Sequence, residues 1–256
     1  MAVEWQDDAI VLSARAYGDS AAVVQLLTRT HGRHAGLVRG GQSRKSKPLL
    51  QPGNRVLAIW KARLAEQLGT LQIELVQDIA GLVFDERLKL SGLLSACAML
   101  EVCLPERAPH PELYTDFGRL IGAMLADASD TTWPADYVRF EIALLRDLGF
   151  ALDLSACAVT GHRDGLVYVS PTSGRAVTAE GAGAYAPRLL PLPSFLVGGN
   201  DTSPPAIASG LRLSGAFLDK HVLAPLDRPM PAARERLADQ FSKQVSEDDI
   251  GHPSGE

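Results

Sequence analysis

The chain has 256 residues, 46% of them hydrophobic and 21% charged, which is enough apolar material for a globular protein with a real core. No apolar run reaches the roughly 18 residues that a membrane span needs. Residues 1–8 are acidic and lack the basic start of a secretory signal, and three scattered cysteines predict no disulfide framework. The sequence therefore predicts a cytoplasmic protein.

The net charge of −5 is unevenly distributed along the chain. Residues 1–80 hold ten Lys and Arg against seven Asp and Glu, a net of +3. The remainder holds 15 against 23, a net of −8. Only the first part is therefore expected to face phosphate.

The first 80 residues predict five short strands joined by turns. Alternating apolar residues and turn residues indicate strands at Ala9–Tyr17, Ala21–Thr28, Arg33–Val38, Arg55–Lys61 and Thr70–Val76. Five short strands without a helical period favour a small closed barrel, most often the five-stranded OB-fold. An SH3-like barrel would give a similar pattern.

After residue 85 the apolar period becomes helical. Helices are predicted at Leu88–Val102, Glu112–Ala126, Pro134–Leu148, Pro205–Val222 and Ala232–Phe241, with one strand at Leu166–Ser170. The helix at Pro134–Leu148 has the clearest buried stripe, made by Tyr137, Phe140, Leu144, Leu145 and Leu148. We expect an α+β protein with a barrel domain at 1–80, a helical domain at 81–241 and a disordered acidic tail at 242–256.

The run RGGQSRKSK, from Arg39 to Lys47, is the most informative local feature. Its glycines let the backbone approach phosphate, and its cations release counterions on binding. The predicted DNA-binding residues are Arg39, Arg44, Lys45 and Lys47 of this run, extended over the barrel by Arg15, Arg33, Arg55, Lys61 and Arg63. A solvated surface loop is the alternative. Tyr17 and Trp60 are the candidate platforms for base stacking.

No catalytic or metal-binding motif is present. The sequence lacks G-x-S-x-G, the phosphate loop, H-E-x-x-H and G-x-G-x-x-G. His31 and His34 flank Gly32-Arg33 and are expected to be exposed beside a turn. Cys97 and Cys103 are expected to be packed in a helix. The sequence therefore predicts a protein that is not an enzyme.

These pieces together resemble one known family. The opening WQDDAIVLSARAYGDSAAVVQLLTRTHGRHAGLVRGG, the basic SRKSK followed by LLQPGN, the helix RFEIALLRDLGF and the pattern YVSPTSGRAV occur in order between Trp5 and about Asp239. In this combination they resemble the bacterial DNA repair and recombination mediators of the RecO family.

The resemblance implies an N-terminal OB-fold and a helical domain with a small zinc-ribbon-like insertion near 155–190. It implies binding to single- and double-stranded DNA, annealing of complementary strands, and association with the nucleoid. It also implies that the protein partners RecR and the acidic C-terminal tail of the single-stranded DNA-binding protein, and indirectly helps RecA to load.

The resemblance also implies particular site residues. Arg139 opens the R-F-E-x-A-L-L motif and is expected to bind the carboxylate of the partner tail, with Arg146 on the same helix surface. Some relatives hold zinc with two C-x-x-C pairs, and the matching positions are Cys157, Thr160, Ser170 and Ser173. Because Cys157 is a lone remnant and hydroxyls are poor zinc ligands, the zinc site is predicted to be lost.

Two other functional classes stay open at this stage. A protein-only adaptor whose barrel does not bind DNA fits the negative net charge and the few aromatic residues. A DNA- or RNA-processing enzyme would need a metal-binding carboxylate cluster, which the sequence does not suggest.

Overall fold

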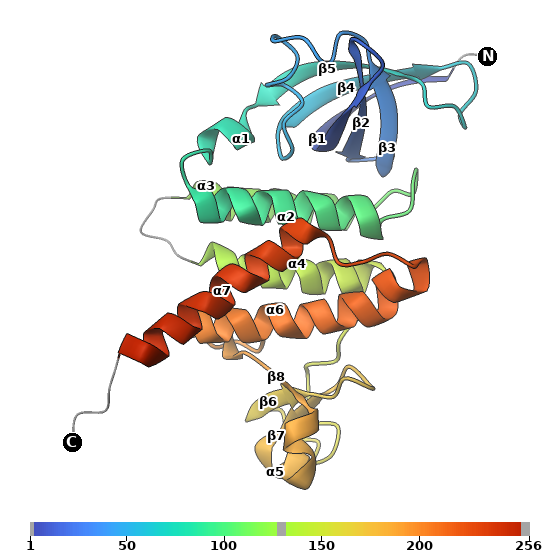
Figure 1. The fold of residues 1–256 in the computed structure, drawn as a ribbon. Coiled ribbons are helices and arrows are strands. Elements are labelled where there is room, and N and C mark those ends of the chain that lie inside the picture. The colour runs from blue at the N-terminus through green and yellow to red at the C-terminus, as the bar shows by residue number, and fades with distance from the viewer. Residues whose placement is uncertain (1–2, 127–131, 252–256) are drawn as a thin grey trace. The chain divides into compact units, whose positions relative to one another are not determined.

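The computed structural model describes residues 3–126 and 132–251, with side chains up to residue 245 (Figure 1). Packing divides it into two compact units, residues 1–125 and 126–256, and each is treated by itself below. Both carry helices, and only the first carries the long strands.

The strands of the first unit form a closed barrel. Neighbours follow the order β1-β2-β3-β5-β4, and β4 pairs back to β1 (Figure 1). Every pair is antiparallel except for a short parallel contact between Leu37 of β3 and Thr70 of β5. The strands are β1 (Val3–Tyr17), β2 (Ala21–Thr28), β3 (Arg33–Val38), β4 (Arg55–Ala62) and β5 (Thr70–Gln77). The prediction of five N-terminal strands is confirmed.

Strand β1 differs from its prediction because it is buried on both faces. It begins at Val3 rather than Ala9. Ala9 and Val11 belong to the barrel core, while Ile10 and Leu12 between them are also buried. Helix α2 (Arg87–Cys103) packs on this strand, and the Cys97 thiol donates to the Val11 carbonyl at 3.7 Å. Simple alternation of apolar and polar residues predicts a strand with one solvent-exposed face. A strand that a helix covers does not have such a face along the covered part.

Two further helices, α1 (Ile79–Leu82) and α3 (Pro111–Leu125), complete the first unit. The connection from α2 to α3 is hydrogen-bonded to the barrel. The guanidinium of Arg33, at the start of β3, donates to the Leu104 carbonyl at 2.9 Å. Gly32 (φ +69°) lies so close to this connection that a Cβ would meet the Ala108 carbonyl at 1.9 Å. The change from strands to helices near residue 80 therefore lies inside the first unit.

The second unit packs three long helices with a small sheet. The helices are α4 (Trp133–Asp147), α6 (Pro204–Leu218), α7 (Ala232–Gly251) and the short α5 (Ala179–Ala182). The sheet has the order β7-β6-β8 and consists of β6 (Leu166–Val169), β7 (Ala176–Thr178) and β8 (Leu190–Pro191). Short 3-10 turns lie at Gly183–Arg188, Ser194–Leu196 and Ala224–Leu226, and α6 continues as a π turn over Asp219–Leu223.

The helices α2, α3 and α4 begin and end within one residue of their predicted bounds, and α6 ends at Leu218, where the predicted helix Pro205–Val222 continues as a π turn; α7 differs more. That helix continues to Gly251, beyond the predicted end at Phe241 and into the segment 242–256 that was predicted to be disordered. Residues 252–256 lie outside the described part of the chain. No helix among the described residues is long and apolar enough to cross a membrane.

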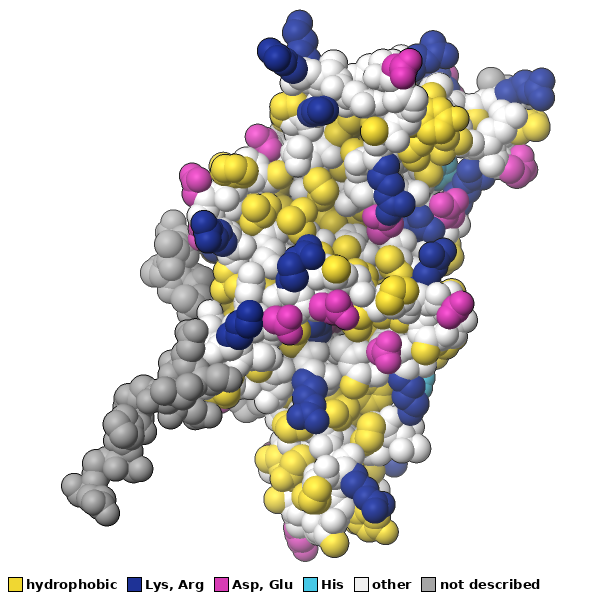
Figure 2. Space-filling model, viewed as in Figure 1, with side chains coloured by type: hydrophobic (Ala, Val, Ile, Leu, Met, Phe, Trp, Pro, Cys, Tyr) yellow, Lys and Arg dark blue, Asp and Glu magenta, His cyan; other side chains and the backbone are white. Residues whose placement is uncertain are grey.

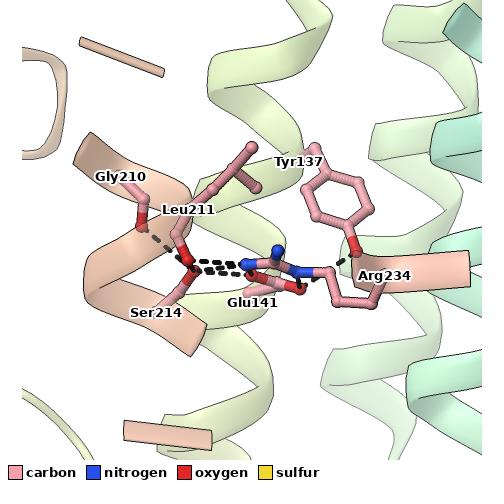
Figure 3. Close-up of polar contacts among 6 residues, drawn as sticks. All are labelled: Tyr137, Glu141, Gly210, Leu211, Ser214 and Arg234. Carbon is pink, nitrogen blue, oxygen red and sulfur yellow. Dashed lines mark hydrogen bonds and ion pairs between the residues drawn. The ribbon is translucent and has the colours of Figure 1, made fainter. Parts of the chain in front are cut away.

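A buried ion pair joins the three long helices of the second unit (Figure 3). Glu141 of α4 is fully buried and Arg234 of α7 is 3% exposed. The guanidinium donates twice to the carboxylate, at 2.6 Å and 2.9 Å, and once to the Leu211 carbonyl of α6 at 2.7 Å. Burial opposes the charge of Arg234, but the carboxylate of Glu141 outweighs it and raises the pKa of the guanidinium.

Two hydroxyl groups complete the set of hydrogen-bond donors around the Glu141 carboxylate. Tyr137, one helical turn earlier on α4, donates to one carboxylate oxygen at 2.9 Å, and Ser214 of α6 donates to the other at 2.5 Å. The carboxylate therefore accepts hydrogen bonds from residues of all three helices, as a charge in a low-dielectric core requires. Polar pairing thus fixes how α4, α6 and α7 are arranged within this unit.

Candidate nucleic-acid interface

The basic run lies on the connection 39–54 between β3 and β4, which is an ordered element. The Ser43 hydroxyl accepts from the Ser46 backbone N–H at 3.1 Å, and the Lys47 N–H donates to the Ser43 carbonyl at 3.0 Å. Leu50 inserts into the barrel core. The Gly53 N–H donates to the Val11 carbonyl at 2.8 Å, which fixes the end of the connection to β1. We call residues 39–47 of this connection the basic loop.

All four cations of the basic loop face solvent. Arg39, Arg44, Lys45 and Lys47 are exposed, and none forms an ion pair with another residue that the structure describes. Figure 2 shows dark blue side chains at the upper edge of the view, above the barrel strands of Figure 1. Arg63, on the connection from β4 to β5, is exposed in the same way. Uncompensated cations on an ordered loop suit a polyanion.

A cleft of about 460 Å³ lies between the basic loop and the place where β3 and β5 separate. Arg39 and Ser46 line it from the loop, and Thr70 and Gln72 line it from β5. A cation beside hydroxyl and amide groups can donate hydrogen bonds to phosphate and sugar oxygens. Ser46, Thr70 and Gln72 are not among the predicted binding residues, although the outward position of Gln72 follows from the alternation of β5.

The other four predicted cations have partners of their own. Arg15 pairs with Glu101 at 2.8 Å, and Lys61 pairs with Glu4 at 2.8 Å. Arg33 donates to Leu104 and Glu106, and Arg55 donates to the Gly118 carbonyl at 3.3 Å. The contacts of Arg15, Arg33 and Arg55 join the barrel to α2, α3 and their connection, and the Lys61–Glu4 pair joins β4 to β1 within the barrel. Of the nine predicted cations, the four of the basic loop and Arg63 are therefore the ones for which the described residues provide no ion-pair or hydrogen-bond partner.

Trp60 is not available for base stacking. It is 1% exposed, and its indole N–H donates to the carbonyls of Ala35 at 3.1 Å and Leu68 at 2.9 Å. The prediction of a stacking platform at Trp60 is wrong because the side chain points into the barrel core. Tyr17, at the turn between β1 and β2, is exposed as that role requires.

The two histidines lie in the barrel wall and do not form a metal pair. His31 stacks on Trp5 with ring centroids 4.3 Å apart, and its Nδ1 lies 2.9 Å from the Asp7 carboxylate. Burial works against the charge of Asp7, but hydrogen bonds from His31 and Thr30 lower its pKa. His34 is 5% exposed between the edges of Trp5 and Trp60. The prediction that both are exposed is wrong for His34.

Acid should destabilise the barrel through His34. Both ring nitrogens are buried without a hydrogen-bond partner among the described residues, and burial, together with the positive charge of Arg107, lowers the pKa to about 4. The unfolded chain therefore takes up this proton first, near pH 6.5. Stability is expected to fall as the pH drops from about 6.5 to 4, by up to about 3 kcal/mol.

Urea unfolding at pH 7, 6 and 5 measures this loss. His34→Phe keeps an aromatic ring and cannot be protonated, so its unfolding free energy should change less over this range. Asp7 contributes separately to the pH dependence. Its pKa is lowered in the folded protein, so the stability that it contributes is lost only as the pH falls below the ordinary aspartate pKa of 3.8. Equal pH dependence in the wild type and in His34→Phe would show that His34 does not titrate in this way.

The four positions that match a zinc site form two hydrogen-bonded turns. The Cys157 sulfur accepts from the backbone N–H groups of Thr160 at 3.4 Å and Thr178 at 3.3 Å. Burial opposes ionisation, but hydrogen bonds from Thr160 and Thr178 lower the pKa of the Cys157 thiol to about 6. The Ser170 hydroxyl accepts from the Ser173 N–H at 3.4 Å. One thiol with three hydroxyls does not fit a zinc ion.

Arg139 lies on α4 against Phe195. Its guanidinium pairs with Asp136 at 2.7 Å, donates to the Phe195 carbonyl at 3.0 Å and stands 5.4 Å from the Phe195 ring centre. Arg146, two helical turns further along, is exposed. An arginine beside an aromatic ring offers both charge and apolar surface to a ligand.

Clusters of metal-binding side chains and buried thiols would be further candidate sites. No group of three or more His, Cys, Asp or Glu side chains among them could hold a metal ion. Cys97 is buried, and burial raises the pKa of its thiol, so that it stays protonated. Cys103 is buried as well.

Comparison with known proteins gives consistent matches over nearly the whole chain. The family model described as Recombination protein O N terminal matches residues 1–79, and the model described as Recombination protein O C terminal matches residues 85–229. The DNA repair protein RecO of Rhodospirillum centenum is 49% identical over 94% of this chain and 96% of its own length. The proteins of the same name from Roseobacter denitrificans (46%; 95% and 100% covered) and Phenylobacterium zucineum (49%; 94% and 98%) are similarly close. The chain belongs to the RecO family.

Proposed function

We propose that this protein is a recombination mediator in DNA repair. In this proposal it binds single- and double-stranded DNA, anneals complementary strands at the nucleoid, and with RecR helps RecA to load onto DNA coated by the single-stranded DNA-binding protein. The observation that carries the proposal is the set of four unpaired cations on an ordered loop of a closed barrel. The names of its relatives agree with this role.

The architecture supports the proposal. The strand order β1-β2-β3-β5-β4 is that of a five-stranded Greek-key barrel, so we assign the barrel to the OB-fold, which commonly binds single strands. We interpret the small sheet of β6, β7 and β8, with its two hydrogen-bonded turns, as a zinc-ribbon-like insertion held by hydrogen bonds.

Annealing two strands requires charge screening and no bond chemistry. Two polyanions approach each other only when cations reduce their repulsion, and each strand must stay free enough to find its register. A basic loop that contacts phosphates without reading bases meets both needs. The protein is therefore proposed to act without being an enzyme.

Reversing the charge of the basic loop tests DNA binding. Arg44→Glu, Lys45→Glu and Lys47→Glu together should abolish binding of a labelled single strand and of a duplex. The matched control reverses Arg163, Arg188 and Arg228, which are exposed residues of the second unit. Unchanged binding in the loop variant would favour an adaptor whose barrel does not contact DNA.

We further propose that Arg139 binds the acidic C-terminal tail of the single-stranded DNA-binding protein, with Arg146 supporting it. An incoming carboxylate would replace Asp136 at the guanidinium, and the Phe195 ring would contact apolar side chains of the tail. Arg139→Ala is expected to weaken binding of a synthetic tail peptide by about tenfold, or roughly 1.4 kcal/mol.

Fluorescence anisotropy of the labelled tail peptide measures this effect. Arg139→Lys should retain part of the affinity for the peptide. It keeps the positive charge but loses the paired N–H donors with which a guanidinium binds both oxygens of a carboxylate. Arg212→Ala, which removes an exposed arginine of α6, is the matched control. Equal affinity for all of these proteins would place the tail site elsewhere.

A further inference from the structure

A second pocket, of about 440 Å³, lies on the other side of the connection between β3 and β4. Lys47, Pro48 and Pro52 line it from the connection. Phe84 follows α1, and Leu90 and Leu94 of α2 form the opposite wall. Phe84 is 70% exposed, which is unusual for a phenylalanine that is held next to a folded core. The pocket is therefore an open apolar site that begins where the basic loop ends.

The two walls of this pocket are held together by a buried side chain. Asn54 is fully buried, its amide N–H donates to the Pro48 carbonyl at 2.9 Å, and its Oδ1 accepts from the Ala80 backbone N–H at 2.9 Å. It thereby joins the connection to α1. The Asp78 carboxylate caps α1 by accepting from the Gly81 N–H at 3.0 Å. The pocket is thus preformed.

The composition of the pocket favours a nucleobase. An exposed aromatic ring among prolines and leucines gives a flat ligand apolar contact on its faces, and Gln51 and Asp78 in the lining offer a donor and an acceptor to its edge. Lys47 contributes to both the basic loop and the pocket wall.

We propose that this pocket takes one unstacked base of a single strand whose phosphates lie on the basic loop, with Phe84 as the stacking surface. The inference rests on the proposed DNA binding and deepens it, because it gives single strands a contact that a duplex cannot make. A base inside a duplex stays stacked on its neighbours. Phe84 therefore raises the affinity for single strands alone.

Phe84→Ala tests the proposal with three probes of equal length: a homothymidine strand, the same strand with abasic sites throughout, and a duplex. Affinity for the homothymidine strand should fall by about tenfold. Affinities for the abasic strand and the duplex should stay unchanged. Phe84→Trp should retain the affinity for the homothymidine strand. Leu82→Ala removes a neighbouring side chain of α1 that is 60% exposed and lies outside the pocket lining, so it is the matched control.

The outcomes separate this inference from the proposed function. If Phe84→Ala binds all three probes as the wild type does, while the loop variants lose them, the base pocket is wrong and the DNA site stands. If the loop variants also bind normally, the proposed DNA site itself is wrong. A Phe84→Ala variant that loses an acidic peptide but no DNA would show that the pocket serves a protein partner.

Discussion

Replacing Arg234 with alanine is expected to lower the unfolding free energy of the second unit by about 3–5 kcal/mol. The substitution leaves the carboxylate of Glu141 fully buried, with only the hydroxyls of Tyr137 and Ser214 as donors. A buried charge without its counter-ion is strongly destabilising. Glu141→Ala should be comparably harmful, because it leaves the buried guanidinium unpaired.

The double variant Glu141→Leu with Arg234→Met separates pairing from packing. It replaces both charges by apolar side chains of similar size, a change that is often neutral or stabilising. Urea unfolding followed by circular dichroism should therefore show two damaged single variants and a double variant nearer to the wild type. Three equal losses would mean that shape, rather than charge pairing, holds α4, α6 and α7 together.

Removing three loop cations is expected to change the salt dependence of DNA binding as well as its strength. Each phosphate contact on a single strand contributes about 0.7 to the slope of log affinity against log salt concentration. The triple alanine variant of Arg44, Lys45 and Lys47 should therefore show a slope that is smaller by about 2. Its affinity at low salt should fall by at least tenfold, and less at high salt.

Titrations of a fluorescent single strand between about 50 and 200 mM salt provide both numbers. Alanine at Arg15, Arg55 and Lys61 is the informative control, since those cations already contact Glu101, Gly118 and Glu4. That variant should keep most of the slope. If the triple alanine variant of Arg44, Lys45 and Lys47 has the wild-type slope, these three cations do not contact DNA phosphates.

Local pattern was sufficient to predict most of the regular structure. β2 and β3 have the bounds that alternation and turn residues indicate, and the alternating apolar residues Ala22, Val24 and Leu26 face the barrel core. The stripe of α4 is buried at Tyr137 and Phe140 for the same reason. In β2 and α4 the most deeply buried residues largely follow the period of a strand and of a helix, so the sequence carries the period of the structure.

Helix α2 shows where that reasoning fails. The helical apolar period of this segment includes Leu90 and Leu94, yet both are only partly buried and line an open pocket. The buried positions include Lys89 and Ser95, on other faces of the helix. A helix that is covered on several sides has no single apolar stripe, so its period does not reveal which residues are inside.

The candidate site was only partly predictable for a different reason. Charge and exposure identified the basic loop, because its cations have no partner in the described structure. The partners of Arg15 and Arg33 lie 86 and 71 residues away, and those pairings exist only in the folded chain. The same holds for Glu141 and Arg234, which are 93 residues apart. Glu141 did give a signal, as an acid within the apolar stripe of α4.

Strand annealing is the measurement that tests the central claim most directly. Two complementary labelled strands are mixed with the wild type, with the loop charge-reversal variant or with the second-unit control, and the rate of pairing is followed by fluorescence. The wild type and the control should accelerate pairing over the spontaneous rate, and the loop variant should not. A wild type that gives no acceleration, or a loop variant that matches it, would contradict a mediator that works through the basic loop.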